Sequence, residues 1–381
     1  MYNGIKRLFF AVVHVVLLSL FWIPLPGGVK AAPTVESEYR EYQKRFEAMH
    51  TVEDIEAAGF VVEKEQKFPV YLEQFGEVMF LPAIDKQCKR MALFFADSEG
   101  NITYKTDQLE ANFQKRGSVK QQVTGLSAVS FQDMNADGLW DIVLISECEK
   151  ESAAKGSAEK ETENTAENIV GNDRNYRVGD VLFQGKKCFY RDWRVSDKVN
   201  RFGMNKSIKV IAAYVRDGYS TEFMYTAATM DELLQNGLHV VSEQCYWRTF
   251  EKLGRLMVVP GTYRIADYEV FMIYLVNEQG NIVWSCQPME DYDSLYALKG
   301  INCRDIDGDG LKDLVVLARY SKEWNGSGVS TQTDYAVYYQ RVSGFTEDKE
   351  IKEQYICRED ETMTELVRAA RAYWGWSTED D

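Results

Sequence analysis

The sequence predicts a β-dominated α+β fold made of two tandem copies of an antiparallel, blade-like sheet unit with short flanking helices. Three observations lead to this prediction. Two Asp-rich loops are each followed by a short run rich in Val, Ile and Leu, which is typical of a buried strand. The chain matches itself over long stretches at nearly constant offsets. Short segments with helix-capping residues flank the strand-like segments of both copies. A small closed β-propeller is the alternative architecture.

The N-terminal segment has the pattern of a secretory signal. Lys6 and Arg7 precede an apolar run that extends to Ile23, and small residues up to Ala31 form a cleavage site. The run is short for a membrane span, which needs about 20 residues. We therefore expect residues 1–31 to be a bacterial-type signal peptide, and the mature protein to be secreted or exposed at the cell surface.

The charge of the chain excludes two classes of partner. The 381 residues carry a formal net charge of −15, and residues 1–31 contain three basic residues and no acid, so the mature chain carries −18. Nucleic acids and anionic membrane surfaces bind basic faces. We expect neither as a partner, and no membrane insertion after signal removal. The seven cysteines form no zinc pattern, and their spacing does not show which would pair in an exported protein.

Both Asp-rich loops have the composition of a calcium site. Oxygen-bearing side chains stand at positions 1, 3, 5 and 9, a glycine allows the turn, and a backbone carbonyl at position 7 completes a cage of the kind that calcium accepts. In loop 1 the predicted ligands are Asp133, Asn135, Asp137, Leu139 and Asp141. In loop 2 they are Asp305, Asp307, Asp309, Leu311 and Asp313. The two leucines would contribute backbone carbonyls.

The loops depart from the EF-hand pattern, because Leu144 and Val316 stand where a bidentate Glu is required. Their D-x-[DN]-x-D-G-x-x-D pattern, followed by a strand, resembles the FG-GAP or VCBS repeat, the blade unit of integrin-type β-propellers. Residues 181–184 and 337–340 resemble a later strand of such a blade. The resemblance covers roughly a third of the chain. It implies an extracellular recognition module with structural calcium.

Self-comparison indicates a long internal duplication. Residues 51–59 match residues 229–237 at an offset of 178, and residues 94–102 match residues 274–282 at an offset of 180. The Asp-rich loops follow at an offset of 172, and the two Val-x-x-Gln segments at 156. Small shifts of this kind are what loop insertions produce. The order of elements should therefore be the same in both copies.

We expect repeat unit 1 over residues 51–228 and repeat unit 2 over residues 229–381. Each unit should begin with a short helix capped by Thr51 or Thr229 and end with an amphipathic helix. The closing helices are predicted over residues 207–214 and 364–373. Residues 32–50 should form an N-terminal helix. The acidic, apolar-poor stretch at residues 149–173 predicts a mobile surface insert.

No motif in the sequence predicts catalysis or an organic cofactor. Only His50 and His239 remain outside the signal, and we expect His239 to be a partly buried strand residue. No Gly-x-Ser-x-Gly elbow occurs. With 59 acidic residues, a glycosidase-like pair of carboxylates cannot be chosen from sequence. The sequence favours a non-catalytic protein, and a secreted hydrolase and a purely structural or inhibitory exoprotein stay open as alternatives.

The predicted function is recognition or adhesion, with an extracellular protein or carbohydrate as ligand and two bound calcium ions. Loop 1 has Asn135 where loop 2 has Asp307, so we expect loop 1 to bind calcium more weakly. Trp374 and Trp376 follow the last helix and suit either a sugar- or peptide-stacking surface or the end of a hydrophobic core.

Overall fold

The computed structural model describes residues 35–113, 121–150, 175–289, 294–323 and 329–376. The predicted signal peptide, and the predicted insert from residue 151 onward, lie outside these residues. The chain divides into two compact units, residues 1–48 and 49–381. The described part of the first unit is helix α2 (Val35–Ala48), along which the rings of Tyr39, Tyr42 and Phe46 stack.

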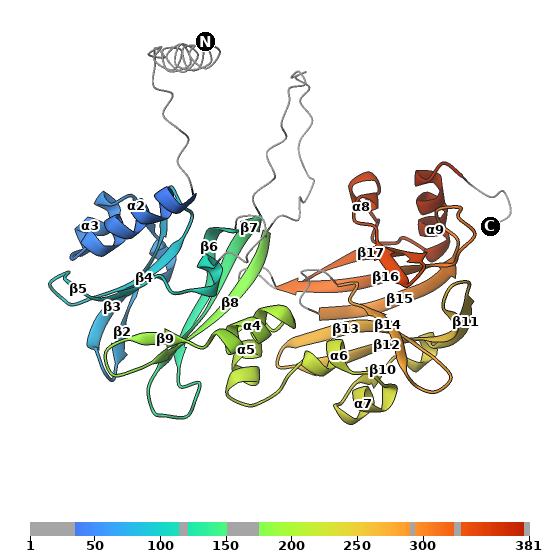
Figure 1. Ribbon diagram of the computed structural model, residues 1–381, viewed down its shortest axis with the longest axis horizontal. Helices are drawn as coiled ribbons and strands as arrows, with labels where there is room; N and C mark the ends of the chain where they lie inside the picture. Colours follow the sequence, from blue (N-terminus) through green and yellow to red (C-terminus); the bar gives the residue numbers. More distant parts are fainter. Residues whose placement is uncertain (1–34, 114–120, 151–174, 290–293, 324–328, 377–381) are drawn as a thin grey trace, which may run out of the picture. The chain divides into compact units, whose positions relative to one another are not determined.

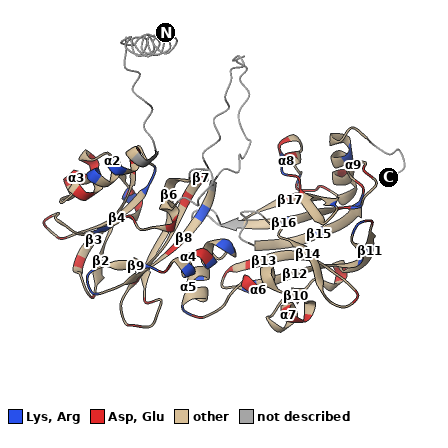
Figure 2. Ribbon diagram, in the orientation of Figure 1, with Lys and Arg blue, Asp and Glu red and all other residues tan. Residues whose placement is uncertain are grey.

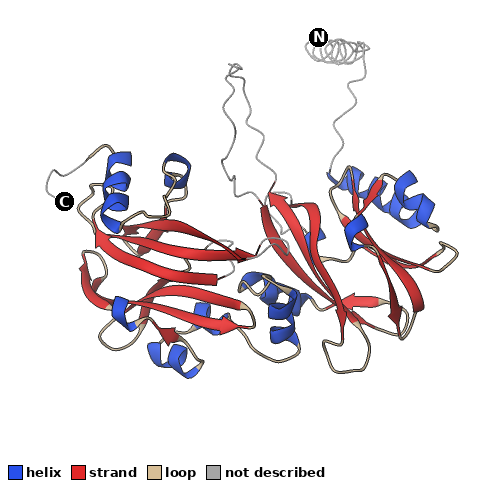
Figure 3. Cartoon of the chain, turned by 180° about the vertical axis from the view of Figure 1, so that it is seen from behind, coloured by secondary structure: helices blue, strands red, loops and turns tan. Residues whose placement is uncertain are grey.

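The second unit contains two series of strands, β1–β9 and β10–β18, that follow one another in the same order (Figure 1), with helices beside them (Figure 3). The first half contains α3 (Val52–Ala57), β1 (Phe60–Val62), the 3-10 helix η1 (Lys64–Gln66), β2 (Phe68–Leu72), β3 (Gly76–Asp85), β4 (Met91–Ala96), β5 (Ile102–Thr106), η2 (Glu110–Asn112), β6 (Gln121–Gln132), β7 (Asp141–Lys150), β8 (Asn175–Gln184), β9 (Phe189–Arg191), α4 (Trp193–Arg201) and α5 (Ile208–Val215). The second half contains α6 (Glu222–Thr226), α7 (Met230–Gln235), β10 (His239–Val240), η3 (Ser242–Gln244), β11 (Tyr246–Phe250), β12 (Gly254–Ile265), β13 (Tyr268–Val276), β14 (Ile282–Cys286), β15 (Ser294–Arg304), β16 (Asp313–Glu323), β17 (Val329–Arg341), β18 (Gly344–Glu347), α8 (Ile351–Gln354) and α9 (Met363–Tyr373).

The first half contains two antiparallel sheets. One has the strand order β1-β3-β4-β5, with β2 also paired to β3, and the other has the order β6-β7-β8-β9. The second half has the same pairings, but one parallel pair between Glu269 of β13 and Ser294 of β15 joins its strands into a nine-stranded sheet. At the corresponding place in the first half, the Val123 amide donates to the Lys89 carbonyl at 2.8 Å. The predicted β-rich α+β class is confirmed, and none of the sheets formed by the described strands closes into a barrel.

The two sheets of the first half pack face to face around one hydrophobic core. Side chains from β2, β3 and β4 meet side chains from β6, β7, β8 and β9. Aromatic rings bridge the sheets: the ring centroids of Phe80 and Phe131 lie 5.2 Å apart, and those of Phe95 and Phe189 lie 5.5 Å apart. The first half therefore has a layered core, as a β-sandwich does.

Helices cover the outer face of each four-stranded arrangement. Ile142 of β7 faces the other sheet, whereas Val143 and Ile145 pack against Val199 of α4 and Ile211 of α5. In the second half, α9 and the segment around α8 cover β16 and β17 in the same way (Figure 1). Because both faces of these strands are buried, they are apolar at consecutive positions. This burial accounts for the apolar runs that follow the Asp-rich loops in the sequence.

Irregularities of pairing recur in both halves. The register between β6 and β7 shifts after Val123 and again after Leu126. The register between β15 and β16 shifts after Leu295 and again after Leu298, which are the positions expected from the offset of 172. A bulge changes the twist and direction of a strand. The two Asp-rich loops are therefore approached by strands of the same local shape.

The predicted helix starts are confirmed at Thr51 and Thr229. The Asp54 carboxylate accepts from the Thr51 amide at 2.9 Å, and the Thr229 hydroxyl accepts from the Glu232 amide at 3.2 Å. His239 lies on a strand as predicted, but its side chain is exposed rather than partly buried, because β10 is a two-residue strand at the sheet edge.

The described residues also bear on membranes and disulfides. In the part of the chain that the structure describes, no helix has both the length and the apolar character needed to cross a membrane. Cys148, Cys286 and Cys303 are buried thiols that form no disulfide. The sequence alone had left the pairing of these cysteines open.

Helix α5 belongs to the cores of both halves. Ile211 and Ala212 pack with β7 and β8, while Val210 and Ala213 belong to the core of the second half. Close packing of α4 and α5 on β8 depends on Gly179, where a Cβ atom would lie 2.8 Å from a side-chain atom of α4. Helix α5 therefore packs against both halves of the second unit.

Asp180 of β8 is a fully buried carboxylate that should make stability depend on pH. It accepts from the Glu110 amide at 2.6 Å, and burial raises its pKa to about 7. The unfolded value is about 4, so between these pH values the folded state binds more protons and the free energy of unfolding falls as pH rises. The shift corresponds to at most about 4 kcal/mol. Relative to wild type, Asp180→Asn should therefore gain stability from pH 4 to pH 7 and show no further change above pH 8, measured by urea unfolding.

Asp217→Asn is the matched control for this experiment. The Arg216 hydrogen bond lowers the pKa of the exposed Asp217 carboxyl, so this replacement should give a slope of the opposite sign or none. A difference between Asp180→Asn and wild type that stays constant from pH 4 to pH 8 would contradict the prediction.

Candidate metal centre

The two Asp-rich loops occupy equivalent places in the fold. Loop 1 (residues 133–141) connects β6 to β7, and loop 2 (residues 305–313) connects β15 to β16. The last residue of each loop, Asp141 or Asp313, is also the first residue of the next strand, and both side chains are fully buried. The loop tips are exposed. Each loop therefore has an exposed tip and a buried last residue.

The carboxylate at position 9 ties each loop to two other segments. In loop 1, Asp141 accepts from the Met134 amide and from the Gln184 amide, both at 2.8 Å. In loop 2, Asp313 accepts in the same way from the amides of Ile306 at 2.7 Å and Gln340 at 2.8 Å. The position-2 side chains, Met134 and Ile306, are buried under the helices. One carboxylate therefore fixes the loop start, the strand start and the neighbouring strand.

The other predicted ligands line the loops through repeated amide contacts. The position-1 carboxylates accept from glycine amides: Asp133 from Gly138 at 2.9 Å, and Asp305 from Gly310 at 2.9 Å. At positions 3 and 5, each side chain accepts from the amide two residues further along the loop. These bonds join the Asp137 amide to Asn135 (3.2 Å), the Leu139 amide to Asp137 (2.9 Å), the Asp309 amide to Asp307 (3.3 Å) and the Leu311 amide to Asp309 (2.8 Å). All ten predicted positions thus belong to two loops of like conformation. The carbonyl roles of the leucines stay predictions.

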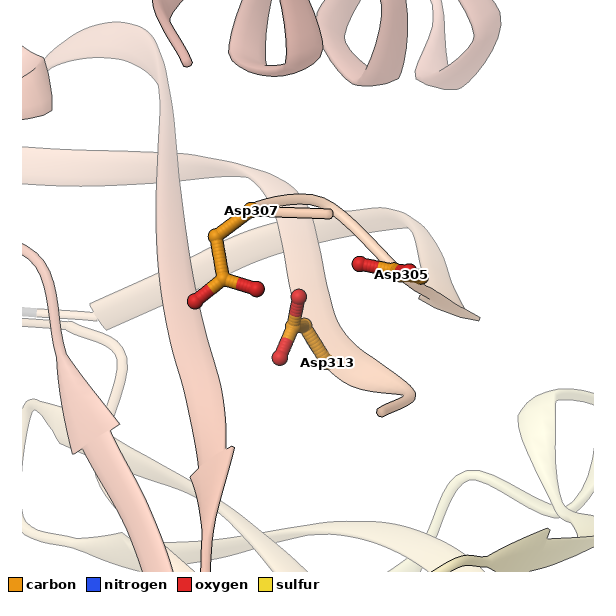
Figure 4. A group of neighbouring side chains, drawn as sticks. All are labelled: Asp305, Asp307 and Asp313. Atoms are coloured by element: carbon orange, nitrogen blue, oxygen red, sulfur yellow. The ribbon is translucent and has the colours of Figure 1, made fainter. Parts of the chain in front are cut away.

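Three carboxylates of loop 2 converge. Oxygens of Asp305, Asp307 and Asp313 all lie within 4.8 Å of one another, and Figure 4 shows their carboxyl groups turned toward a common space. Calcium–oxygen distances of 2.3–2.6 Å place two ligand oxygens up to about 5 Å apart. The donor set and its spacing therefore fit a hard divalent cation. In loop 1, Asn135 replaces the second carboxylate and donates to Asp137 at 3.0 Å.

Burial and mutual repulsion act on the position-9 carboxylates. Burial raises the pKa of Asp141 to about 6 and that of Asp313 to about 7, and the neighbouring loop carboxylates add to both shifts. A cation bound among these groups would favour their charged forms. Without a bound cation, the carboxylates of each loop repel one another around the buried position-9 side chain.

Arg341 is an unpredicted counter-charge at loop 2. Its guanidinium lies 3.2 Å from Asp307 and 3.3 Å from Asp309. The offset of 156 places Gly185 at the equivalent position beside loop 1. Loop 2 has four carboxylates and Lys312, so together with Arg341 its net charge is −2, whereas loop 1 has three carboxylates and a net charge of −3. The prediction that loop 1 binds calcium more weakly than loop 2 is based on the loop carboxylates alone.

A glutamate that the loop motif does not predict lies behind each loop. Glu73 accepts from the Trp140 amide at 3.1 Å and from the Gln184 side chain at 2.9 Å. Glu251 accepts from the Lys312 amide at 2.8 Å and from the Gln340 side chain at 3.1 Å, and it forms an ion pair with the Lys312 side chain. Although burial opposes it, the hydrogen bonds of Lys312 lower the pKa of Glu251 to about 2. The offset of 178 pairs these two glutamates, and that signal could have identified them.

The C-terminal aromatic residues cover loop 2. The Trp376 indole donates to the Ile306 carbonyl at 2.8 Å, and its ring would meet a Cβ atom at Gly308 at 3.3 Å. Arg371 of α9 donates to the Asp305 carbonyl at 3.0 Å and lies over the Trp376 ring. Trp376 thus packs on the backbone of loop 2, so the two roles expected for it, a stacking surface or the end of a hydrophobic core, do not include its main contact. Trp374, which donates to Tyr339 at 2.7 Å, remains half exposed.

Comparison with known proteins does not place the chain in a family. No family model and no curated protein matches it. Among solved structures it has a weak similarity to a rhamnogalacturonan lyase from Bacillus licheniformis, with a TM-score of 0.20 and 12% sequence identity. That match covers 73% of this chain and 46% of the lyase, so the chain spans less than half the length of that structure. A similarity at this level supports no conclusion on fold or activity.

Arg341 should weaken cation binding at loop 2. Replacing it with the residue found at loop 1, Arg341→Gly, should lower the Kd of loop 2 for calcium about three- to tenfold, because two partly exposed ion pairs no longer compete with the cation. The measurement is isothermal titration calorimetry in an Asp137→Ala background, which confines binding to loop 2.

Arg264→Gly is the control, since it removes the same charge from an exposed side chain of β12, ten residues along the strand from Gly254, next to which Glu251 reaches loop 2. It should leave the Kd of loop 2 within about twofold of its starting value, because exposed charges separated by more than a Debye length are largely screened. Equal effects of the two replacements would show that Arg341 acts only through net charge.

Proposed function

We propose that this protein is an exported, non-catalytic recognition or adhesion module that binds an extracellular protein or carbohydrate and carries two structural calcium ions. The observation that supports it best is the shared scaffold of the two loops, in which a buried carboxylate accepts from equivalent amides in both halves. Two independent acidic turns have no reason to share this hydrogen-bond pattern.

The four-stranded sheets support the likeness to FG-GAP or VCBS repeats. A propeller blade is a four-stranded antiparallel sheet. Strands β6–β9 form one such sheet, with loop 1 between its first two strands, and β15–β18 repeat the arrangement with loop 2. The shared bulges support the view that the chain arose by duplication. The five-stranded part of each half lies outside the likeness.

Calcium is the cation that the loops favour. The donors are oxygens on a flexible turn, whereas magnesium demands a tighter octahedron and keeps several waters. At ~1–2 mM free calcium and a Kd of ~10⁻⁴–10⁻³ M, each site would contribute about 1–2 kcal/mol to folding. That contribution suits an extracellular protein, because calcium there is abundant and constant. The position-9 carboxylates already hold the strands, so the cation would act on structure rather than on a substrate.

A hydrolase is the second candidate, and one group favours it. Burial raises the pKa of Glu63, and the nearby carboxylates of Glu65 and Glu147 raise it further. A carboxyl with a raised pKa close to a second carboxyl is the arrangement that glycosidases use. The second half has Val241 and Arg319 at the places of Glu63 and Glu147, so the fold does not require this cluster. Hydrolysis of a glycan panel by wild type but not by Glu63→Gln would favour this candidate.

The calcium proposal predicts a cation-specific gain in stability. Adding calcium to the mature protein should raise Tm by several degrees relative to chelator, magnesium should not, and Asp137→Ala/Asp309→Ala should abolish the rise. The two loops can be followed separately by tryptophan fluorescence, since Trp140 lies in loop 1 and Trp376 covers loop 2. Trp140→Phe should remove one part of the calcium-dependent change, and Trp376→Phe the other.

An unchanged Tm in calcium would reject the metal sites and leave the hydrolase candidate for assay. A rise that persists in the double variant would place calcium elsewhere on this acidic chain.

A further inference from the structure

We propose that the first half binds an anionic polysaccharide through the surface formed by the β8–β9 turn, β9 and α4. This α4 surface is defined by the exposed side chains of Lys186, Lys187, Tyr190, Trp193, Arg194 and Arg201. The inference rests on the proposed recognition function and names the chemical class of its ligand.

The local charge runs against that of the whole chain. Residues 185–209 contain eight Lys or Arg and two Asp, a net charge of +6 in a chain of −15 (Figure 2). Some of these cations have carboxylate partners, namely Arg191 with Glu110, Lys198 with Glu222, and Lys209 with Asp267. The four basic residues of the α4 surface are exposed to solvent. Because they lie on the β8–β9 turn and on α4, which are close in sequence, they give this segment a local positive potential that can attract a negatively charged ligand.

Two aromatic rings are exposed in the same region. The side chains of Tyr190 and Trp193 are 51% and 61% exposed. Tyr190 is supported from below by Phe183, with ring centroids 5.7 Å apart, and the Arg194 guanidinium lies 5.3 Å from the Trp193 ring centroid. A flat apolar ring beside a planar guanidinium can stack on a sugar ring and pair with its carboxylate or sulfate group.

The second half shows that the fold does not require this surface. Strands β17 and β18 pair like β8 and β9, with Gln340 opposite Phe345 as Gln184 is opposite Phe189. The equivalent segment, residues 341–365, has four Lys or Arg and eight Asp or Glu, a net charge of −4. At the offset of 156, a threonine and a lysine stand at the positions of the two exposed rings. The basic and aromatic character therefore belongs to the first half alone.

A polysaccharide fits this surface better than the other polyanions. Double-stranded DNA carries one charge per about 1.7 Å and needs a broad basic face, whereas this chain as a whole has a net charge of −15. An anionic membrane meets the same repulsion from the rest of the molecule. A uronate or sulfated glycan has sparser charges, separated by ring faces, which matches cations interspersed with aromatic rings.

The test is a binding titration of the mature protein with hyaluronan and with chondroitin sulfate, followed by biolayer interferometry in calcium. Dextran serves as the neutral glycan, and a DNA duplex and phosphatidylglycerol vesicles as the other polyanions. We expect binding to at least one anionic glycan, none to dextran, and a loss of about tenfold or more in Trp193→Ala/Arg194→Ala. Binding should weaken as salt rises from 50 to 300 mM.

The matched control is Trp247→Ala/Arg255→Ala, which removes another exposed pair, with Arg255 4.8 Å from the Trp247 ring centroid, on the second half. It should bind as wild type does. The inference is overturned if no anionic glycan binds, if the two double variants lose equal affinity, or if DNA or vesicles bind and the glycans do not.

Both double variants are also melted with calcium and with chelator. A calcium-dependent rise in Tm without glycan binding would overturn this inference and leave the structural calcium sites standing. Glycan binding without any calcium-dependent rise in Tm would support this inference and reject the structural calcium sites.

Discussion

The structure of each half depends on one buried carboxylate. Asp141 and Asp313 each receive two backbone amides, one from the start of their own loop and one from the adjacent strand. A buried charge costs several kcal/mol unless hydrogen bonds or an opposite charge compensate it. Placing that charge at the first residue of a central strand forces the loop, the strand and its neighbour to adopt one arrangement. The helices then cover the position-2 side chains, and the layers follow.

Much of this arrangement could be read from the sequence because its determinants are local. The Thr caps, the loop pattern and the apolar runs each depend on residues a few positions apart, and self-comparison extended them to the whole chain. The division of the first half into two facing sheets could not be predicted, because contacts such as the hydrogen bond from Val123 to Lys89 join segments far apart in the sequence. Arg341 and Glu251 could not be predicted for the same reason, since they reach loop 2 from the end of β17 and from the turn between β11 and β12. Internal repetition marked the glutamates, whereas Arg341 has no counterpart in the first half.

The two halves share a scaffold and differ in charge. Both loops have the same hydrogen bonds to backbone amides. The negative charge is lower in loop 1 because Asn135 replaces a carboxylate, and in loop 2 it is partly neutralised by the Arg341 guanidinium. The segment after the third strand of each four-stranded sheet is basic in one half and acidic in the other. Backbone hydrogen bonds and apolar contacts set the fold, and exposed side chains are free to change sign without disturbing it. Duplication thus supplies an internal reference: what recurs is structural, and what differs is a candidate for function.

Helix α5 limits how modular such a duplicated chain can be. One side of the helix completes the first half and the other side completes the second. A fragment that stopped after the first half would expose Val210 and Ala213 to water, and one that began after α5 would lack part of its core. The two copies are therefore not independent folding units that could be removed or repeated. Growth of this architecture by a third copy would need a second helix that packs on two halves, whereas the contacts of α9 are with loop 2 and the strands of its own half.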